Sequence, residues 1–467
     1  MHVQNIFLMI KGILFILLFL SCAKETPDPE PGSIPEIEEA ELAINTYYVA
    51  PPPLGHDNNP GTKEKPWATW NKAFNAFEVG PDDTVYFRGG VYYHTYLDGG
   101  YGYGCTRSGK ADHYVNYLNY PGETPILDCG AIKPAGMLNY PVYMRHLAYA
   151  HFRGLHIRNV WQADGEDEVQ AWTITESHDI IVERCVVYNT HGLSFSSNVN
   201  NEVYYINCDS YNNCDSLTTV PANNPMPGND GTGFSDFNWH TSDTRVYYIN
   251  CRAWNSGDQG FTSGSNGYTE YDGCWSFRNG LLEGGGHGFK MGWIAKVDPS
   301  ITHRLYKNCL AVYNRRYGFD SNDQGYYCGS LQVYNNTSYH NGYYNQGKVA
   351  AGFYVYNTLD TDERELLRLY KNNISYANEM GDIIVGKNGI YIHERNSWDN
   401  PPGVKITDAT FISTDSSGLA GPRQADGSLP DLDFLKLAPG SPAIDAGTKS
   451  TGLSYKGSAP DLGAYEH

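Results

Sequence analysis

The sequence predicts an all-β protein built as a parallel β-helix, a solenoid with a short N-terminal capping helix and long loops on one face. Three observations support this prediction. A phrase around a cysteine recurs along the chain, each phrase follows a short run of alternating side chains, and a Gly-Phe pair recurs between phrases. Helical periodicity is almost absent after residue 80. Each coil of such a solenoid buries its inward side chains by stacking on its neighbours.

The composition describes an acidic, aromatic-rich globular chain. Its 467 residues include 33 Lys or Arg and 52 Asp or Glu, which gives a formal net charge of −19. An aromatic content of 14% excludes a disordered acidic chain, because such chains lack the apolar surface that offsets conformational entropy. The negative balance argues against nucleic acid as a partner, since duplex binding depends on Lys and Arg displacing counterions from phosphates.

The N-terminus is typical of an exported protein. Lys11 precedes the apolar run GILFILLFLSC, which is too short to span a bilayer comfortably and reads as a signal segment over residues 1–22. FLSC resembles a bacterial lipobox, so we expect Cys22 to carry a lipid anchor in the outer membrane, with exposure at the cell surface left open. The alternative is a plain secretory signal with an incidental cysteine. Residues 23–43 are acidic and Pro-rich, as in an extended tether, and one folded domain is expected over 44–467.

The recurring phrase marks one position in each coil. Neighbouring markers are at least 23 residues apart, which suggests a coil of about that length with loops of variable size. Five cysteines at one repeat position do not form a disulfide framework, and they lack the paired spacing of zinc ligands. We expect them to stack in a narrow core. The markers are Cys185, Cys208, Cys251, Cys274 and Cys309, followed by Asn336 and Asn373.

The Gly-Phe pair predicts a second inward column, and therefore an outward column beside it. Side chains alternate along a strand, so the residue after each Phe should point outward. Stacked coils lie about 4.8 Å apart, which predicts that Lys290 is flanked by Thr262 and Asp320. The inward column is expected at Leu193, Phe234, Phe261, Phe289, Phe319 and Phe353, and the outward column at Ser194, Ser235, Thr262, Lys290, Asp320 and Tyr354.

The two ends of the solenoid need covers. Trp67, Trp70, Phe74 and Phe77 have helical spacing, and a short amphipathic helix there would cover the first coil. After about residue 415 the repeat fades into SPAIDAG and DLGAYE, which we expect to close the other end.

One stretch carries a family resemblance. Residues 229–322 contain NDGTGF, NCRAWNSGDQGF, GHGFKMG, NCLAVYN and GFDSN, and resemble the family 9 polysaccharide lyases, which are pectate and rhamnogalacturonan lyases. The resemblance covers about a hundred residues well and most of the remaining mature chain loosely. It implies a right-handed β-helix, an acidic plant polysaccharide as the partner of a monomeric enzyme, and Lys290 as the catalytic base.

The resemblance also implies a calcium ion. Its carboxylate ligands would fall on Thr232, Asp258, Gln259 and Thr262, of which only Asp258 is acidic. A hydroxyl or an amide is a weaker partner for a hard cation than a carboxylate. Asp230 and Asp236 lie nearby in sequence and could compensate, so calcium dependence is left open.

Elimination from a uronide needs a base and a positive group. The base removes the proton at C5, and the positive group stabilises the charge that builds on the adjacent carboxylate. An unperturbed lysine is protonated to about pH 10, so Lys290 would need cationic neighbours or burial to act as a base. Stacking on sugar rings is a further expectation for Trp239, Trp254 and Trp293, although Trp254 follows the cysteine column and could equally lie in the core. The residues expected to bind the substrate are Arg315, Arg316, His287, Asp320 and Asn322.

Two other functions remain open at this stage. A glycoside hydrolase on the same fold would need converging carboxylates, for which Asp320 and Asp323 are the candidates. A non-catalytic glycan-binding protein of the cell surface would account for the missing calcium carboxylates. Ultraviolet-absorbing unsaturated product, reducing sugar alone, or binding without turnover would distinguish the three.

Overall fold

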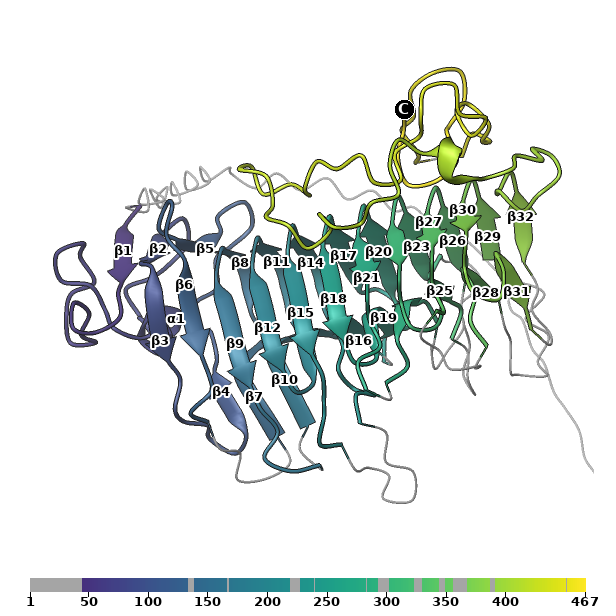
Figure 1. Ribbon diagram of the computed structural model, residues 1–467. Helices are drawn as coiled ribbons and strands as arrows, with labels where there is room; N and C mark the ends of the chain where they lie inside the picture. The colour runs from purple at the N-terminus through teal and green to yellow at the C-terminus, as the bar shows by residue number, and fades with distance from the viewer. Residues whose placement is uncertain are drawn as a thin grey trace, which may run out of the picture. The chain divides into compact units, whose positions relative to one another are not determined.

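The computed structural model shows a parallel β-helix (Figure 1). It describes residues 44–132, 138–165, 168–218, 227–238, 240–282, 284–292, 302–322, 330–343, 349–355, 368–386, 391–450 and 452–467. The predicted signal segment, Cys22 and the acidic tether lie outside these residues. None of the helices in the described part of the chain is long and apolar enough to cross a membrane.

Three parallel sheets form the coils, and the chain passes through sheets A, B and C in turn. Sheet A contains β1 (Thr46–Val49), β2 (Thr84–Phe87), β5 (Val115–Asn119), β8 (Ala148–Arg153), β11 (His178–Glu183), β14 (Asn201–Ile206), β17 (Arg245–Ile249), β20 (Tyr268–Asp272), β23 (Arg304–Lys307), β26 (Leu331–Tyr334), β29 (Arg368–Lys371) and β32 (Ile392–Glu394). Sheet B contains β3 (Gly90–Tyr93), β6 (Pro125–Asp128), β9 (His156–Val160), β12 (Val186–Thr190), β15 (Asp209–Asn213), β18 (Arg252–Ser256), β21 (Trp275–Phe277), β24 (Leu310–Val312), β27 (Thr337–Tyr339) and β30 (Ile374–Tyr376). Sheet C contains β4 (Tyr101–Tyr103), β7 (Leu138–Arg145), β10 (Glu168–Thr175), β13 (Leu193–Asn198), β16 (Phe234–Asn238), β19 (Gln259–Ser265), β22 (His287–Lys290), β25 (Phe319–Asp320), β28 (Phe353–Val355) and β31 (Ile383–Val385).

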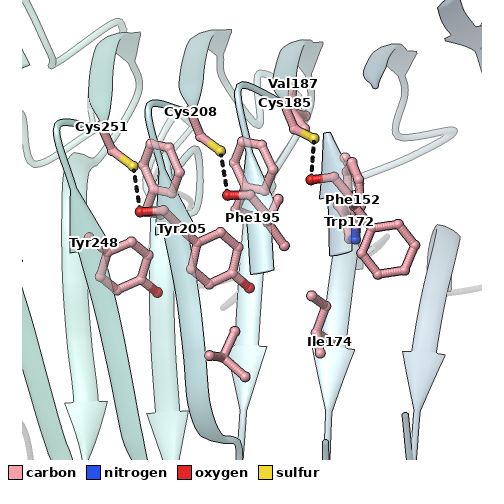
Figure 2. Close-up of a cluster of buried hydrophobic side chains, with 14 of the residues drawn as sticks. Phe152, Trp172, Ile174, Cys185, Val187, Phe195, Tyr205, Cys208, Tyr248 and Cys251 are labelled. Carbon is pink, nitrogen blue, oxygen red and sulfur yellow. Dashed lines mark hydrogen bonds between the residues drawn. The ribbon is translucent and has the colours of Figure 1, made fainter. Parts of the chain in front are cut away.

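The corner between sheets A and B explains the recurring phrase. The residue before the cysteine has a left-handed backbone, with φ of 56° at Asn207, 52° at Asn250 and 58° at Asn308. Asparagine tolerates this conformation better than most residues, because its short side chain can hydrogen-bond locally. The cysteine then points inward, and the thiol of Cys251 donates to the carbonyl oxygen of Tyr205 in the preceding coil at 3.3 Å (Figure 2).

Asparagine continues the cysteine column in the later coils, as predicted. Nδ2 of Asn336 donates to the carbonyl of Tyr306 at 3.0 Å, and its Oδ1 accepts the N–H of Cys309 at 2.9 Å. Asn373 donates in the same way to Val333 at 2.8 Å. The eight cysteines among the described residues are all free, so the predicted ladder without disulfides is confirmed for them.

The inward phenylalanine column is confirmed in five coils and wrong in one. It consists of Phe234, Phe261, Phe289, Phe319 and Phe353. Successive rings stack with centroids 4.8 or 4.9 Å apart. In the preceding coil, however, Phe195 pairs with Phe234, whereas Leu193 pairs with Gln170. The outward residue there is therefore Ser196 rather than Ser194, because His-Gly-Leu does not occupy the Gly-Phe position.

A short helix enters the core near the N-terminal end of the described chain. Helix α1 (Trp70–Asn75) lies in the connection between β1 and β2, where later coils have strands of sheets B and C. Trp70 and Phe74 of the helix are buried in the main core, as a capping helix requires. Trp67 is buried there too, but it lies before the helix, in a β-bridge with Val49. Phe77 is 79% exposed, so the prediction was wrong for this residue, which follows the end of the helix.

Asn396 still continues the asparagine column, donating to the carbonyl of Tyr370 at 2.8 Å, and Trp398 packs on Phe353 in the main core. Beyond these residues the segment after residue 395 leaves the coils and packs on the outer face of sheet B (Figure 1). The sequence predicts that the chain after about residue 415 closes the C-terminal end of the β-helix. Instead its apolar side chains form a second core with outward residues of sheet B. The two partners in this core are Phe411, Leu419, Phe434, Leu435 and Leu437 from the segment, and Trp254, Trp275, Phe277, Leu310 and Val312 from the sheet.

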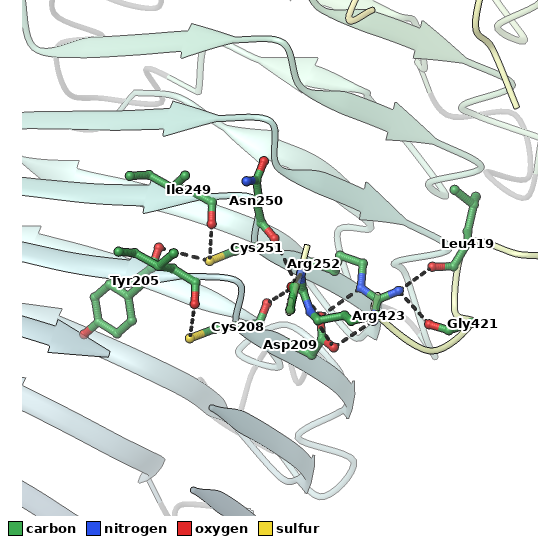
Figure 3. A network of polar contacts seen from close by, with 12 residues as sticks. Tyr205, Cys208, Asp209, Ile249, Asn250, Cys251, Arg252, Leu419, Gly421 and Arg423 are labelled. Atoms are coloured by element: carbon green, nitrogen blue, oxygen red, sulfur yellow. Dashed lines mark hydrogen bonds and ion pairs between the residues drawn. The ribbon is translucent and has the colours of Figure 1, made fainter. Parts of the chain in front are cut away.

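A buried ion-pair network fastens this segment to the sheet (Figure 3). The carboxylate of Asp209 lies 2.7 Å from guanidinium nitrogens of both Arg252 and Arg423. Arg252 also donates to the carbonyl oxygens of Leu419 and Gly421, each at 2.9 Å. Burial alone would raise the pKa of Asp209, but the two arginines hold it below its ordinary value. We call Asp209, Arg252 and Arg423 the clasp.

Candidate functional site

Lys290 lies at the end of β22 on the outer face of sheet C. Its neighbour Phe289 points into the core, so the alternation of strand side chains directs Lys290 outward. The register pairs Lys290 with Thr262 of β19 on one side and with Asp320 of β25 on the other. The predicted neighbours of Lys290 are therefore confirmed.

The glycine that precedes each inward phenylalanine has no room for a side chain. A Cβ on Gly288 would lie 2.5 Å from the carbonyl oxygen of Gly318, and one on Gly260 would lie 2.0 Å from Oγ of Ser276. The close approach of backbone and side chains at this corner explains why Gly and Phe recur together. It also fixes the strand from which Lys290 projects.

Lys290 is paired with Asp258, which lies one coil earlier in the turn before β19. Nζ of Lys290 is 3.2 Å from Oδ2 of Asp258. The other carboxylate oxygen accepts the N–H of Gly285 at 3.1 Å. The Asp258 side chain is 5% exposed and that of Lys290 is 21% exposed, so solvent reaches the lysine but hardly its partner.

A second close pair, His287 and Asp320, lies beside Lys290. Nδ1 of His287 is 2.9 Å from Oδ2 of Asp320, and both side chains are almost fully buried. The contact is an ion pair when His287 is protonated. Burial lowers the pKa of His287, and Asp320 opposes that effect. Burial would raise the pKa of Asp320, but His287, the N–H of Asn322 and Lys290 hold it below its ordinary value.

The two predicted arginines do not contact Lys290. They lie between β24 and β25, where the guanidinium of Arg315 donates to the carbonyl of Leu282. The guanidinium of Arg316 lies 5.0 Å from the ring centroid of Tyr317. They therefore border the site instead of supplying positive charge next to Lys290.

Asn322 contributes through its backbone. Its N–H donates to Oδ1 of Asp320 at 2.9 Å, in a left-handed conformation with φ of 44°. A residue expected to contact substrate through its side chain thus holds the carboxylate of Asp320 through its backbone N–H.

Asp230 is exposed and lies near the Lys290–Asp258 pair. The carbonyl of the next residue, Gly231, accepts the N–H of Asp258 at 2.9 Å, which brings the two turns together. The surrounding protein and then the Asp258 carboxylate raise the pKa of Asp230, while Lys290 lowers it. Asp230 therefore belongs to the electrostatic surroundings of Lys290.

The positions expected to hold calcium form a different arrangement. Nε2 of Gln259 donates to the hydroxyl of Thr232 at 2.7 Å. Asp236, which could have compensated for a missing carboxylate, is buried inside the β-helix, where it accepts a hydrogen bond from Thr269. Among the residues that the structure describes, no group of three His, Cys, Asp or Glu could hold a metal ion. Because calcium prefers about six to eight oxygen ligands, including carboxylates, this donor set does not fit it.

Sequence reasoning missed Tyr317. Its ring lies 5.4 Å from that of His287 and stacks on Tyr354 at 4.4 Å, so it joins the His287 pair to Arg316. The missed signal is the residue before each Gly-Phe pair, which belongs to an outward column of its own: Gln259 pairs there with His287.

Of the three tryptophans expected to stack on sugar rings, the structure describes Trp254, which offers no such surface. Trp254 is 9% exposed and lies between the rings of Tyr211 and Phe277 in the second core. Trp239 and Trp293 lie outside the described residues, as does Asp323, one of the two carboxylates considered for a hydrolase.

Comparison with known proteins gives one family match. Residues 47–381 match the family described as "Pel9A-like, right handed beta helix region". Pectate lyase L of Dickeya dadantii is 35% identical over 199 residues, which are 41% of this chain and 41% of that protein. The chain thus spans less than half the length of this curated relative.

Two solved structures share the fold. The crystal structure of pectate lyase Pel9A has a TM-score of 0.69 and 24% identity, and the match covers 91% of this chain and 97% of Pel9A. A structure titled rhamnogalacturonan lyase also has a TM-score of 0.69 and 24% identity, and the match covers 84% of this chain and 96% of that one.

Proposed function

Because the chain belongs to the Pel9A-like family of right-handed β-helix proteins, we propose that it is a polysaccharide lyase acting on an acidic pectic glycan. The substrate would be rhamnogalacturonan I or homogalacturonan, and the names of the relatives support this class. The observation that carries the proposal is the placement of Lys290. It is partly exposed on the outer face of sheet C, beside the buried side chains of Asp258, His287 and Asp320.

The reaction is a β-elimination with Lys290 as the base. The neutral amine takes the proton from C5 of a uronate residue, the C4–C5 double bond forms, and the C4–O bond to the next sugar breaks. The leaving oxygen then takes up a proton. Proton transfer turns Lys290 into an ammonium, which Asp258 at 3.2 Å would stabilise.

Arg316 is the proposed contact for a uronate carboxylate. Its guanidinium lies over Tyr317, one coil beyond Lys290, and remains partly exposed. Guanidinium groups bind carboxylates in a bidentate manner. Both guanidinium groups also donate to backbone carbonyls, that of Arg315 to Leu282 and that of Arg316 to Val349. Arg316 is preferred because it lies over Tyr317, whose ring is next to that of His287.

An ultraviolet assay on a panel of pectic polysaccharides tests this function. The wild-type protein should release unsaturated uronides that absorb in the ultraviolet. Replacing the base, in Lys290→Ala, should lower the rate by about 10²- to 10⁴-fold. The matched control is Lys307→Ala, which removes a partly buried lysine paired with Glu270 at 2.9 Å on sheet A and should keep full activity.

Two results would reject the proposal. Reducing sugar without ultraviolet absorbance would indicate hydrolysis, and full activity of a folded Lys290→Ala variant would exclude Lys290 as the base. Saturable binding of every glycan without turnover would instead support the non-catalytic alternative.

We also propose that the chain is an exported lipoprotein anchored through Cys22. The apolar run before Ser21-Cys22 and the acidic tether after it support this location. In a bacterial host, Cys22→Ser should move the protein from the membrane fraction to the soluble fraction. Unchanged membrane association would contradict the anchor.

A further inference from the structure

The inference concerns the counter-charge of Asp258 and rests on the proposed function. Asp258 is the single carboxylate among the four positions at which the resemblance implies calcium ligands. It is buried, and a buried carboxylate needs a charged partner or several hydrogen bonds to remain ionised. The identity of that partner decides whether the site needs a metal ion.

In the structure that partner is Lys290. Its ammonium nitrogen lies 3.2 Å from Oδ2 of Asp258, while Oδ1 accepts the N–H of Gly285. Both oxygens of the carboxylate are thus used by groups of the protein itself. A calcium ion on Asp258 would have to displace the ammonium or remain next to it against like-charge repulsion.

The other three positions at which the resemblance implies calcium ligands carry no negative charge. Thr232 and Gln259 are hydrogen-bonded to each other, and Thr262 is buried between strands next to Lys290. Oε1 of Gln259 is buried without a hydrogen-bond partner. One neutral amide oxygen and one paired carboxylate fall short of the set of oxygen ligands that holds calcium.

We propose that this centre works without calcium, with the ammonium of Lys290 serving as the counter-ion of Asp258 in the resting enzyme. The lysine then has two duties in one cycle. As an ammonium it neutralises Asp258 in the resting enzyme, and it gives that proton to solvent before it acts as the base. Once the neutral amine has taken the proton from C5, it is again the ammonium beside Asp258.

Calcium titration of the whole protein tests the proposal, with thermal unfolding and calorimetric heat as readouts. Wild type should show no saturable heat at this centre and the same Tm in chelator and in calcium. The variant Thr232→Asp/Gln259→Asp/Thr262→Asp restores the three carboxylates, and its Tm should rise with calcium concentration. If that variant does not fold, the wild-type titration still decides.

Saturable calcium binding by wild type that disappears in Asp258→Asn would overturn the proposal. Binding that persists in Asp258→Asn lies elsewhere and leaves the centre free of metal. Loss of lyase activity in chelator, reversed by calcium, would also overturn it. Absence of unsaturated product under every condition would instead reject the proposed function, and the titration would still report on the metal.

Discussion

Nδ1 of His287 lies 2.9 Å from Oδ2 of Asp320, which belongs to the next coil of the β-helix. The pair is enclosed beside Lys290, and each member shifts the pKa of the other: Asp320 raises that of His287, and His287 lowers that of Asp320. The protonation of His287 therefore depends on its burial and on this contact, with further effects of Lys290 and Asp258.

Removing the carboxylate should make His287 harder to protonate. In Asp320→Asn, burial continues to lower the pKa of His287, while the opposing effect of the carboxylate is gone. Titration of the imidazole by NMR should therefore give a lower pKa than in wild type. Asp82→Asn, which removes the partner of the partly exposed His113, is the control and should leave His287 unchanged. An equal or higher pKa in Asp320→Asn would contradict the assignment.

A methyl group added at Gly285 should displace side chains of the candidate site. Its Cβ would lie 2.3 Å from Oδ1 of Asp258 and 2.9 Å from Nε2 of His287. Both side chains must move, and a displacement of about 1 Å can lower a rate by about 100-fold. Steady-state kinetics of Gly285→Ala should show this loss. The control is Gly80→Ala, where no atom lies within 4 Å of the new Cβ, and its rate should match that of wild type. If Gly285→Ala were as active as wild type, the positions of Asp258 and His287 would not matter for the rate.

Stability should decrease in mild acid because of His94. This residue is buried against Tyr103, and burial lowers its pKa to about 4. In the unfolded chain the pKa is about 6.5. Between these values the unfolded state binds a proton that the folded state does not. The free energy of unfolding should therefore fall as the pH drops through this window, by about 1.4 kcal/mol per pH unit for this one group.

Urea unfolding of His94→Asn at several pH values between about 4 and 7 tests this contribution. The variant should show a shallower pH dependence than wild type. His146→Asn, at an exposed histidine, should keep the wild-type slope. If the free energy of unfolding depended on pH equally in wild type and in His94→Asn, His94 would not be the cause of the lower stability in acid.

Loss of the clasp should destabilise the protein strongly. Asp209→Ala leaves the buried guanidinium groups of Arg252 and Arg423 without their carboxylate, which should lower the free energy of unfolding by about 3–5 kcal/mol. Arg423→Ala should have a smaller effect, since Asp209 keeps Arg252. Denaturant unfolding measures both, and limited proteolysis should cut the segment after residue 395 first.

The control for the clasp is Asp431→Ala, which breaks an exposed pair with Lys436. Its effect should be at most about 1 kcal/mol. If Asp209→Ala were no more destabilising than Asp431→Ala, the clasp would not be what holds the segment.

The coils could be predicted from the sequence because their pattern is local and repeated. Strand alternation and the Gly-Phe pair were enough to place Lys290 between Thr262 and Asp320. The same pattern failed at Leu193, because the sequence before that strand lacks the Gly-Phe pair and gives no sign that the register has moved by two residues.

The pairing of side chains across coils could not be predicted in this way. Asp258 faces Lys290, and Arg315 faces a backbone carbonyl, because of turn geometry that no periodic pattern records. The clasp joins Arg423 to Asp209, which is 214 residues away in the sequence, and this contact does not recur from coil to coil. Such contacts depend on how an irregular segment crosses the sheet, which only the three-dimensional structure shows.

The position of the segment after residue 395 also has a consequence for the order of folding. During synthesis the strands of sheet B leave the ribosome before the residues that cover them. Until those residues arrive, the second core exposes a row of large apolar side chains, including Trp275, Phe277 and Leu310. Transiently exposed surface of this kind favours aggregation. A chain shortened before Phe411 should therefore form coils that associate with one another, although every strand of the β-helix is present.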